Sequence, residues 1–318
     1  MTAAEWHGVF PYLVSPVDAD GTPNVAMLTK LVEYAIECGV HGLTPLGSSG
    51  EFPYFSEGAR RTIIDATVVA AAGRVPVVPG IGGFSVEETV RQARYAEAAG
   101  ADGVLFVPQA FSPLADSEVI RFVDATVNSV GVPVVLYHNP PLCGVRLSPG
   151  LVGKLVERCG LRYVKDASGD LNNIDRWRDA GGSRLRIFSA TAVSPTAAML
   201  LGTVGWMSGP ACAFPAESVA IYEACREGHW EQARIIERAI EPALESFRVL
   251  GPCRGAKALV TAMGFAVGQP IAPIDPLSAD DLDKGRACVA EVKRRLAEIG
   301  FLRPAADVGE IGEAVRLA

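Results

Sequence analysis

The sequence has no long apolar segment and no excess of positive charge. No apolar run approaches the roughly 20 residues that a membrane-spanning helix needs, and the N-terminus lacks the basic and apolar regions of a signal peptide. The net charge of the 318 residues is −7, which disfavours binding to nucleic acids or to anionic membranes. We therefore expect a cytoplasmic protein that binds neither nucleic acid nor membrane.

Cysteine and histidine are too scattered to form a zinc site of the common kinds. The seven cysteines include no CxxC pair, and only four histidines accompany them. Because zinc sites are built from closely spaced pairs of such residues, the pattern predicts reduced thiols and no metal site. A magnesium ion held by carboxylates alone would leave no such signature, so that alternative stays open.

Short apolar runs rich in Val, Ile and Leu alternate with helical patterns along most of the chain. Most residues of each run are apolar, which is typical of parallel strands that are buried on both faces. Glycines such as Gly39 and Gly160 end helical patterns just before the next run begins. We expect strands at Val9–Val14, Val40–Leu46, Val75–Ile81, Val104–Val107, Val132–Tyr137, Leu161–Lys165, Leu185–Phe188 and Val204–Met207.

Eight strands, each followed by a helix, predict an α/β fold of the (β/α)8 TIM-barrel type. A doubly wound open sheet is the alternative, but no GxGxxG motif follows the first strand. After about Phe214 only helical patterns remain. We expect a barrel catalytic domain over residues 1–228 and a helical C-terminal extension over residues 229–318, in which residues 303–318 form a short helix or are mobile.

Lys165 ends the sixth expected strand, at the barrel end where active sites of such folds lie. It alone among the six lysines ends a buried strand, whereas Lys257 in an apolar helical stretch is ambiguous. Desolvation lowers the pKa of a lysine from about 10.4 towards neutrality. The free amine can then attack a carbonyl group and form a Schiff base. A structural ion pair with Asp166 is the alternative.

Two other strand ends carry candidate groups. The sequence GSSGE at residues 47–51 offers hydroxyls and backbone N–H groups that suit a carboxylate, or it is a plain glycine-rich turn. Tyr137 is either a buried core aromatic or a group that moves protons to and from a substrate. The adjacent His138 should point to the other side of its strand, so we expect a structural role for it.

Four motifs, taken in order, resemble the dihydrodipicolinate synthase/N-acetylneuraminate lyase family of class I pyruvate aldolases. Each motif is weak alone, but their order and spacing match the family's over roughly residues 6–300. The resemblance implies a TIM barrel, a lyase that uses a Schiff base and no cofactor, and a homotetramer built as a dimer of dimers. The motifs are residues 47–51, Tyr137 with the following Asn139-Pro140, residues 165–169, and residues 205–208.

The resemblance also implies roles for single residues. Lys165 would form an imine with the C2 carbonyl of pyruvate or of a longer 2-oxo acid. Tyr137 would move protons to and from the substrate, and Ser48 would pass a proton to Tyr137. Gly47, Ser48 and Ser49 would hold the C1 carboxylate. The remaining substrate-binding positions would be Met207, Ser208, Leu142 and Ser189.

The chain departs from both best-known members of this family at the positions that bind the second substrate. Leu142 follows Tyr137 where dihydrodipicolinate synthases carry an arginine, and residues 108–111 (PQAF) replace the tyrosine that a neighbouring subunit contributes. An arginine clamp on a carboxylate is not replaced by leucine without loss. Residues 189–192 (SATA) lack the carboxylates with which sialic acid lyases bind sugar hydroxyls.

We therefore expect a Schiff-base lyase or aldolase that forms or cleaves a C–C bond between pyruvate and an aldehyde with a small or apolar distal part. One alternative is a dehydratase that uses the same imine on a 3-deoxy-2-oxo sugar acid, and another is dihydrodipicolinate synthase proper. A non-catalytic 2-oxo acid-binding protein represents a different class. Such a protein would have no reason to keep Lys165, Tyr137 and Ser48 together.

Overall fold

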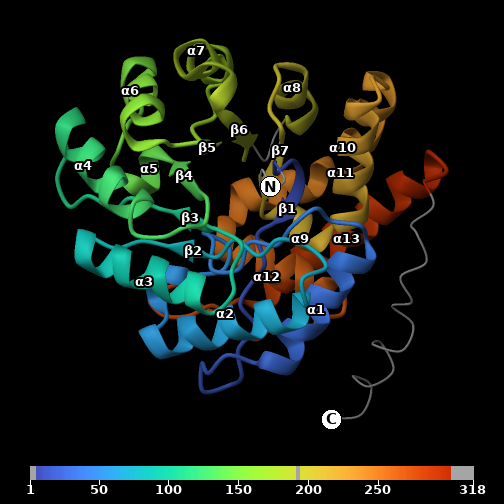
Figure 1. Cartoon of the computed structure of the whole chain (residues 1–318). Helices are drawn as coiled ribbons and strands as arrows, with labels where there is room; N and C mark the ends of the chain where they lie inside the picture. Colours follow the sequence, from blue (N-terminus) through green and yellow to red (C-terminus); the bar gives the residue numbers. More distant parts are fainter. Residues whose placement is uncertain (1–4, 191–193, 302–318) are drawn as a thin grey trace.

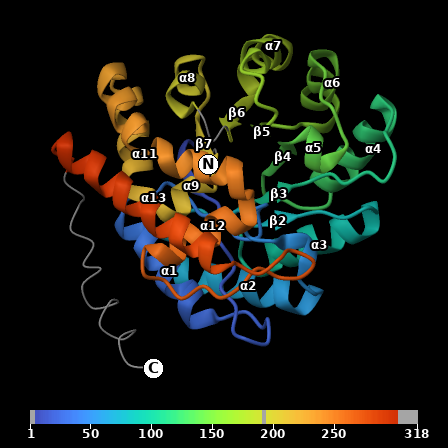
Figure 2. The same cartoon turned by 180° about the vertical axis from the view of Figure 1, so that it is seen from behind.

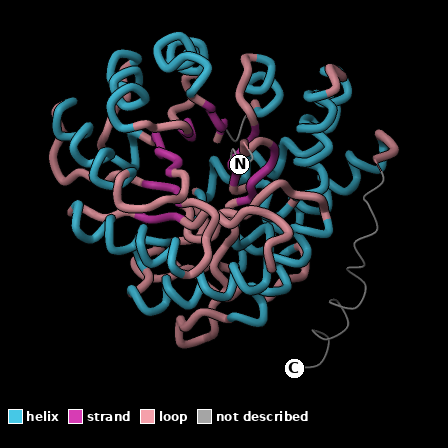
Figure 3. The backbone as a smooth tube through the Cα atoms, in the orientation of Figure 1, coloured by secondary structure: helices cyan, strands magenta, loops and turns pink. Residues whose placement is uncertain are grey.

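A curled parallel sheet forms the centre of the molecule. The computed structural model describes residues 5–190 and 194–301. In this part of the chain seven strands pair in the order β1-β7-β6-β5-β4-β3-β2, and Figure 3 shows them in the middle of a ring of helices. The strands are β1 Gly8–Pro11, β2 Gly80–Ile81, β3 Val104–Phe106, β4 Val134–His138, β5 Tyr163–Asp166, β6 Arg186–Ser189 and β7 Gly205–Ser208.

The second expected strand, Val40–Leu46, is not a regular strand, so the prediction of eight regular strands was wrong by one. Leu43 and Thr44 form only isolated bridges. Their backbone N–H groups nevertheless donate to the carbonyl groups of Pro76 and Pro11, respectively. Because Pro11 belongs to β1 and Pro76 precedes β2, this segment spans the gap between the two outermost strands and closes the ring.

Proline explains why the ladder is short in this part of the barrel. Pro45, Pro76 and Pro79 have no backbone N–H to donate, and each therefore removes a potential ladder bond. The third expected strand, Val75–Ile81, contains two of these prolines and is reduced to the two residues of β2. The expected strand positions were correct here, but regular pairing over their whole length was not.

Helices surround the sheet in chain order (Figure 1). Two of these helices begin after Ser85 and Ser148, and each serine hydroxyl accepts a hydrogen bond from a backbone N–H three residues later. Gly160 has a φ of +68° after one of these helices, which is the left-handed conformation that glycine adopts readily. The surrounding helices are α1 Val25–Glu37, α2 Glu57–Ala71, α3 Val86–Ala98, α4 Asp116–Val127, α6 Pro149–Cys159, α7 Asn172–Gly181, α8 Pro195–Leu200 and α10 Pro215–Arg226.

The C-terminal part of the described chain is helical, as predicted. Figure 2 shows these helices packed together against the barrel. The boundary expected at residues 228/229 stays a prediction, and the expected tail 303–318 lies outside the described residues. None of the helices in residues 5–190 and 194–301 is long and apolar enough to cross a membrane. The C-terminal helices are α11 Trp230–Leu250, α12 Pro252–Ala262 and α13 Ala279–Glu298, and the short elements are α5 Pro140–Cys143, α9 Pro210–Ala213, η1 Phe52–Tyr54 and η2 Gly182–Arg184.

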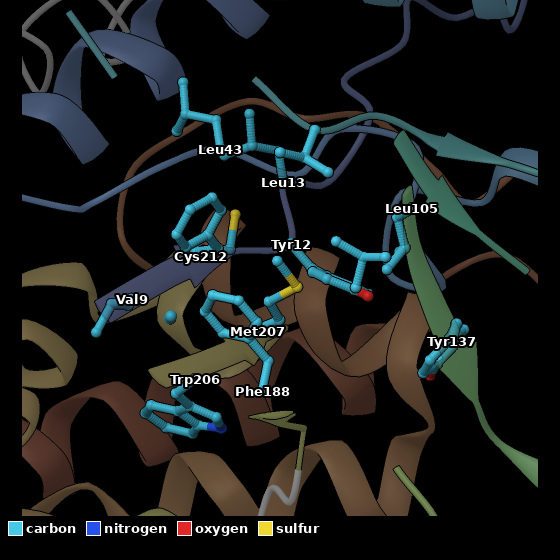
Figure 4. Close-up of a cluster of buried hydrophobic side chains, with 14 of the residues drawn as sticks. Val9, Tyr12, Leu13, Leu43, Leu105, Tyr137, Phe188, Trp206, Met207 and Cys212 are labelled. Carbon is cyan, nitrogen blue, oxygen red and sulfur yellow. The ribbon is translucent and has the colours of Figure 1, made fainter. Parts of the chain in front are cut away.

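Side chains from several strands fill the centre of the barrel. Figure 4 shows Tyr12, Phe188 and Met207 gathered there, with Tyr137 projecting from β4 nearby. All four side chains are buried. The rings of Tyr12 and Tyr137 lie edge to face, with centroids 6.4 Å apart. This packing fixes the orientation of both phenols, since edge-to-face aromatic pairs prefer a narrow range of geometries.

Candidate active site

Lys165 lies on β5 with its side chain on the interior face of the barrel. The strand register aligns it with Tyr137 of β4 and Phe188 of β6. Residues in one register row of a sheet point to the same face. The lysine is 2% exposed, so almost no solvent remains to stabilise its ammonium form.

Asp166 does not neutralise Lys165, which removes the alternative of a structural ion pair between these neighbours. Its carboxylate lies on the opposite face of β5, where one oxygen is 2.9 Å from Nδ1 of His138. The backbone N–H and the hydroxyl of Ser168 also donate to this carboxylate. The Nε2 atom of His138 accepts the N–H of Leu147, so His138 has the structural role predicted from its place on the strand. No carboxylate of residues 5–190 or 194–301 forms an ion pair with Lys165.

Two aromatic rings enclose the amine of Lys165. Its Nζ atom lies 3.9 Å from the ring centroid of Tyr12 and 3.8 Å from that of Tyr137. Burial lowers the pKa of Lys165 well below its ordinary value, and the opposing effects of Cys143 and Asp166 are smaller. A greater fraction of the side chain is therefore a free amine near neutral pH, and a free amine is the form that attacks carbonyl groups.

Tyr137 presents a protonated phenol beside this amine. The side-chain amide of Asn139 donates a hydrogen bond of 2.8 Å to the phenol oxygen. Burial raises the pKa of Tyr137 to about 12, although hydrogen bonds with Asn139 and Ser48 act in the opposite direction. At neutral pH the phenol is consequently a proton donor that is connected to Ser48, and this arrangement suits a proton relay.

The GSSGE loop turns tightly beneath the same site. The N–H of Gly50 donates to the carbonyl group of Gly47 at 3.0 Å. A Cβ atom on Gly47 would lie 2.4 Å from the ring of Tyr12, and one on Gly50 would lie 2.8 Å from a backbone nitrogen. Only glycine fits at both positions, so the loop can bring Ser48 and Ser49 close to the amine.

A buried ion pair attaches this loop to the C-terminal helices. Glu51 and Lys257 have side chains that are 0% exposed, and their charged atoms are 3.2 Å apart. The other Glu51 oxygen accepts the N–H of Ile271 at 2.7 Å. The amine of Lys257 also donates to the carbonyl group of Gln269. Lys257, which was ambiguous in the sequence, therefore has a structural partner at the end of the GSSGE loop.

Desolvation is the main electrostatic effect on this pair. It raises the pKa of Glu51 and lowers the pKa of Lys257, while the attraction between the two charges opposes both shifts. A second contact joins α12 to the loop, because the thiol of Cys253 donates to the carbonyl group of Ser48. Helix α12 thus holds both ends of the segment that contains the two serines.

One cavity of about 570 Å³ contains the amine of Lys165. A neighbouring lobe of about 420 Å³ shares Ser48, Tyr137, Leu142 and Pro252 with it. The lobe is lined largely by apolar side chains, among them Phe52, Val107, Leu250 and Ile274. The main cavity is lined by Tyr12, Ser48, Ser49, Tyr137, Asn139, Leu142, Lys165, Ala167, Ser168, Gly169, Leu171, Ala190, Ser194, Met207, Gly209, Pro210, Phe247, Arg248 and Pro252.

The structure brings together six of the nine residues that the sequence indicated for the site. The other three, Gly47, Ser189 and Ser208, lie beside the cavity and do not line it. Ser189 and Ser208 alternate with inward-facing positions of β6 and β7, and both are buried on the other face. Their role in substrate binding stays a prediction. The six that line the cavity are Ser48, Ser49, Tyr137, Leu142, Lys165 and Met207.

Some lining residues were missed at the sequence level. Asn139 was part of a recognised motif, so its place next to Tyr137 was a usable signal. Tyr12 comes directly after β1, so its place at the carboxyl end of a strand was also a usable signal. Phe247 and Arg248 come from α11, where no strand-end rule applies. In residues 5–190 and 194–301 no three His, Cys, Asp or Glu side chains are grouped to hold a metal ion.

Comparisons with known proteins show what the chain is similar to. Residues 5–292 match the model of the dihydrodipicolinate synthetase family. An uncharacterised DapA-like lyase from Halobacterium salinarum is 30% identical over 93% of this chain and 95% of its own. A 4-hydroxy-tetrahydrodipicolinate synthase from Acidiphilium cryptum is 27% identical over 93% of this chain and 99% of its own.

The fold is shared with solved structures of related proteins. The 4-hydroxy-tetrahydrodipicolinate synthase from Methylacidiphilum fumariolicum superposes with a TM-score of 0.88 at 25% identity, over 93% of this chain and 99% of its own. This likeness, together with the closed parallel sheet, confirms the predicted TIM-barrel class with a helical C-terminal region.

Proposed function

The chain belongs to the dihydrodipicolinate synthetase family, whose members are lyases, and we propose that it uses a Schiff base on Lys165 to cleave or form a C–C bond between pyruvate and an aldehyde. The observation that carries the proposal is the amine of Lys165. It is buried without a carboxylate partner among the described residues, and it lies between two tyrosine rings. Structural lysines are rarely buried without an opposite charge.

The cavity supplies the groups that each step of this reaction needs. The free amine of Lys165 attacks the C2 carbonyl of a 4-hydroxy-2-oxo acid, and loss of water gives the imine. The protonated imine accepts the electron pair of the C3–C4 bond when that bond breaks, while the C4 hydroxyl loses its proton and leaves as an aldehyde. Protonation of the resulting enamine at C3 and hydrolysis release pyruvate and restore the amine.

Tyr137 and the serine loop serve the proton transfers and substrate orientation in this proposal. The Tyr137 phenol, hydrogen-bonded to Asn139, is placed to give and take the protons of the C2 and C4 oxygens. The hydroxyls of Ser48 and Ser49, with nearby backbone N–H groups, would bind the C1 carboxylate. The apolar lobe next to Leu142 would hold a small or apolar body of the aldehyde.

Borohydride trapping tests the proposed nucleophile directly. After incubation with pyruvate and reduction, mass spectrometry of the digested protein should find one stable adduct, located on Lys165. Lys154→Met removes an exposed lysine and keeps the candidate nucleophile, whereas Lys165→Met removes the nucleophile, so only the second variant should lose the adduct. A wild-type protein without an adduct on Lys165 would exclude the Schiff-base mechanism.

A panel of acceptor aldehydes then separates substrates. We expect turnover with pyruvate and aliphatic or aromatic aldehydes that carry no charged amino group to exceed turnover with aspartate semialdehyde, because the lobe next to Leu142 is lined largely by apolar side chains. Relatives of this chain are named 4-hydroxy-tetrahydrodipicolinate synthase. Preference for aspartate semialdehyde over the rest of the panel would therefore assign that activity instead.

We also infer from the family that the protein is a homotetramer. The family's catalytic groups lie near an interface between subunits, and here residues 108–111 occupy that position. A neighbour of the same fold is described as a monomeric variant of dihydrodipicolinate synthase, at 24% identity. The oligomeric state is thus a property that must be measured for each member.

A further inference from the structure

Helix α11 places one arginine on the wall of the cavity that contains Lys165. Arg248 lies two residues before the end of this helix, and Phe247 and Pro252 on either side of it in sequence line the same cavity. The chain turns sharply at Gly251, whose φ is +79°, before α12 begins. The turn between α11 and α12 therefore presents Arg248 to the substrate cavity.

The charges around the two lobes are all of one sign. No Asp or Glu is among the residues that line the cavity or its neighbouring lobe in the described part of the chain. The charged lining residues are Lys165 and Arg248 in the cavity and Arg254 in the lobe. The carboxylates that pair with the two arginines lie outside this lining, so the groups that face the cavity favour an anionic ligand.

Arg248 has hydrogen-bonding capacity left for such a ligand. Its Nε atom donates to Glu245 at 2.8 Å, and its Nη2 atom donates to the other oxygen of the same carboxylate. No residue in the described ranges accepts a bond from Nη1. Glu245 does not line the cavity, so it orients the guanidinium without occupying the site. The side chain is 66% exposed, which leaves it accessible to a substrate.

Arg254 is less available than Arg248. Its Nη2 atom donates to Asp281, whose side chain is only 6% exposed. Asp281 also accepts bonds from the backbone N–H and the hydroxyl of Ser278 at the start of α13. Arg254 is therefore part of the contact between α12 and α13, whereas the Nη1 group of Arg248 has no partner among the described residues and can bind substrate.

We propose that Arg248 binds a carboxylate at the far end of the substrate, so that the preferred 2-oxo acid carries a second carboxylate beyond a short carbon chain. The proposal rests on the proposed imine at Lys165, which fixes the first end of the molecule. Leu142 removes the guanidinium expected on the barrel side, and α11 supplies one from the C-terminal helices. A planar guanidinium matches the geometry of a carboxylate.

Imine trapping tests this proposal without any need for turnover. The probes are two pairs of 2-oxo acids of equal chain length, in which only one member has a terminal carboxylate: 2-oxoglutarate with 2-oxopentanoate, and 2-oxoadipate with 2-oxohexanoate. The measured quantity is the concentration of each acid that gives half-maximal borohydride-trapped adduct on Lys165. Pyruvate, which has no second carboxylate, is trapped in parallel.

We expect at least one dicarboxylate to reach half-maximal trapping at a concentration about tenfold below that of its monocarboxylate partner, as for one charge-assisted hydrogen bond. Arg248→Ala should remove this preference and leave pyruvate trapping unchanged. Arg248→Lys should retain part of it, because the charge remains without the planar fork. High salt should weaken the preference in the wild type.

The control is Arg286→Ala on α13, which removes another exposed arginine that pairs with an acidic residue three positions earlier. It should retain the full preference. Equal trapping of dicarboxylates and monocarboxylates overturns the role of Arg248, and so does a preference that survives in Arg248→Ala. In either case pyruvate trapping still supports the imine. Absence of the pyruvate adduct from the wild type overturns both proposals.

Discussion

At the scale of single residues, the position of Lys165 is favourable for chemistry and unfavourable for stability. The ammonium form has lost its hydration, and no described carboxylate compensates for the loss. An enzyme gains from this arrangement because the amine is a better nucleophile when it is neutral. A protein without a reaction to perform would gain from replacing it.

We predict that Lys165→Met abolishes the pyruvate adduct and stabilises the protein by about 1–2 kcal/mol near neutral pH. Methionine fills a similar volume without a charge to desolvate. The measurement is the urea midpoint of wild type and variant at equal protein concentration. A variant that is less stable than the wild type would show that the lysine is a structural group.

The size of this stabilisation should depend on pH. The pKa of Lys165 is lowered on folding, so between its folded and its unfolded pKa the unfolded chain binds more protons than the folded chain. The stability contributed by this position then rises with pH across that window. We predict that the advantage of Lys165→Met is largest at low pH and shrinks as the pH approaches about 10.4. An advantage that stays constant with pH would contradict the lowered pKa.

Mutation should separate the proposed role of Tyr137 in proton transfer from that of Lys165 in imine formation. In Tyr137→Phe the amine remains, so pyruvate should still be trapped after borohydride reduction. The C–C bond step should slow by about a hundredfold or more, because the phenol that moves protons is missing. The control is Tyr222→Phe, since Tyr222 is hydrogen-bonded to His7 and does not line the Lys165 cavity. Equal turnover by Tyr137→Phe and wild type would assign proton transfer to another group.

At the scale of elements, helix α12 determines where the serine loop lies. The Glu51–Lys257 pair is completely buried, and removing one partner of such a pair leaves an uncompensated charge in the interior. Helix α12 therefore positions the loop that we propose to bind the substrate carboxylate. The C-terminal helices thus both line the cavity that contains Lys165 and hold the serine loop in place.

We predict that Lys257→Met destabilises the protein by about 3–5 kcal/mol and raises the pyruvate concentration needed for half-maximal trapping. The exposed Lys154, which pairs with Asp116 at 3.8 Å, provides a matched control. Lys154→Met should change stability by less than about 0.5 kcal/mol. Replacing both members of the buried pair, in Glu51→Leu/Lys257→Met, should restore part of the stability. Equal loss in the single and double variants would argue against an uncompensated charge as the cause.

The sequence predicted the positions of the strands better than the length over which they pair regularly. Apolar runs located all strands of the sheet, because strands buried on both faces need apolar residues at every position. The prediction of a regular strand at Val40–Leu46 was wrong because apolar residues indicate burial, whereas regular strand pairing also needs backbone N–H donors. Proline at positions 45, 76 and 79 removes such donors. The segment is buried as expected and yet forms only isolated bridges.

At the scale of the whole molecule, the site combines residues from the barrel with residues from the C-terminal helices. The barrel residues Lys165, Tyr137 and Ser48 were predictable, because strand ends converge at one face of a TIM barrel. Arg248 was not, because its place depends on how α11 packs against the barrel. Helix packing is set by side-chain contacts between distant segments, and no local pattern in the sequence records them.

The surface near the site leads to a prediction about assembly. Phe111 is 98% exposed, and its neighbour Ala110 approaches Gly144, close to the half-exposed Leu142. Exposed aromatic and aliphatic side chains that lie close together mark association surfaces. The family resemblance also places a tyrosine from a neighbouring subunit at residues 108–111. A second copy of the chain that covers Phe111 would therefore also border the lobe next to Leu142.

We predict that sedimentation of the wild type gives the mass of four chains of 33.5 kDa each, and that Phe111→Asp gives smaller species, because a buried carboxylate without a partner opposes association. Val69→Asp makes the same change at an exposed position of α2 and should leave the mass unchanged. The smaller species should also trap pyruvate less well if the partner subunit supports the loops around the lobe. A wild type that sediments as one chain would mean that the exposed Phe111 has another role, and a mass lowered only by Val69→Asp would place the interface on α2.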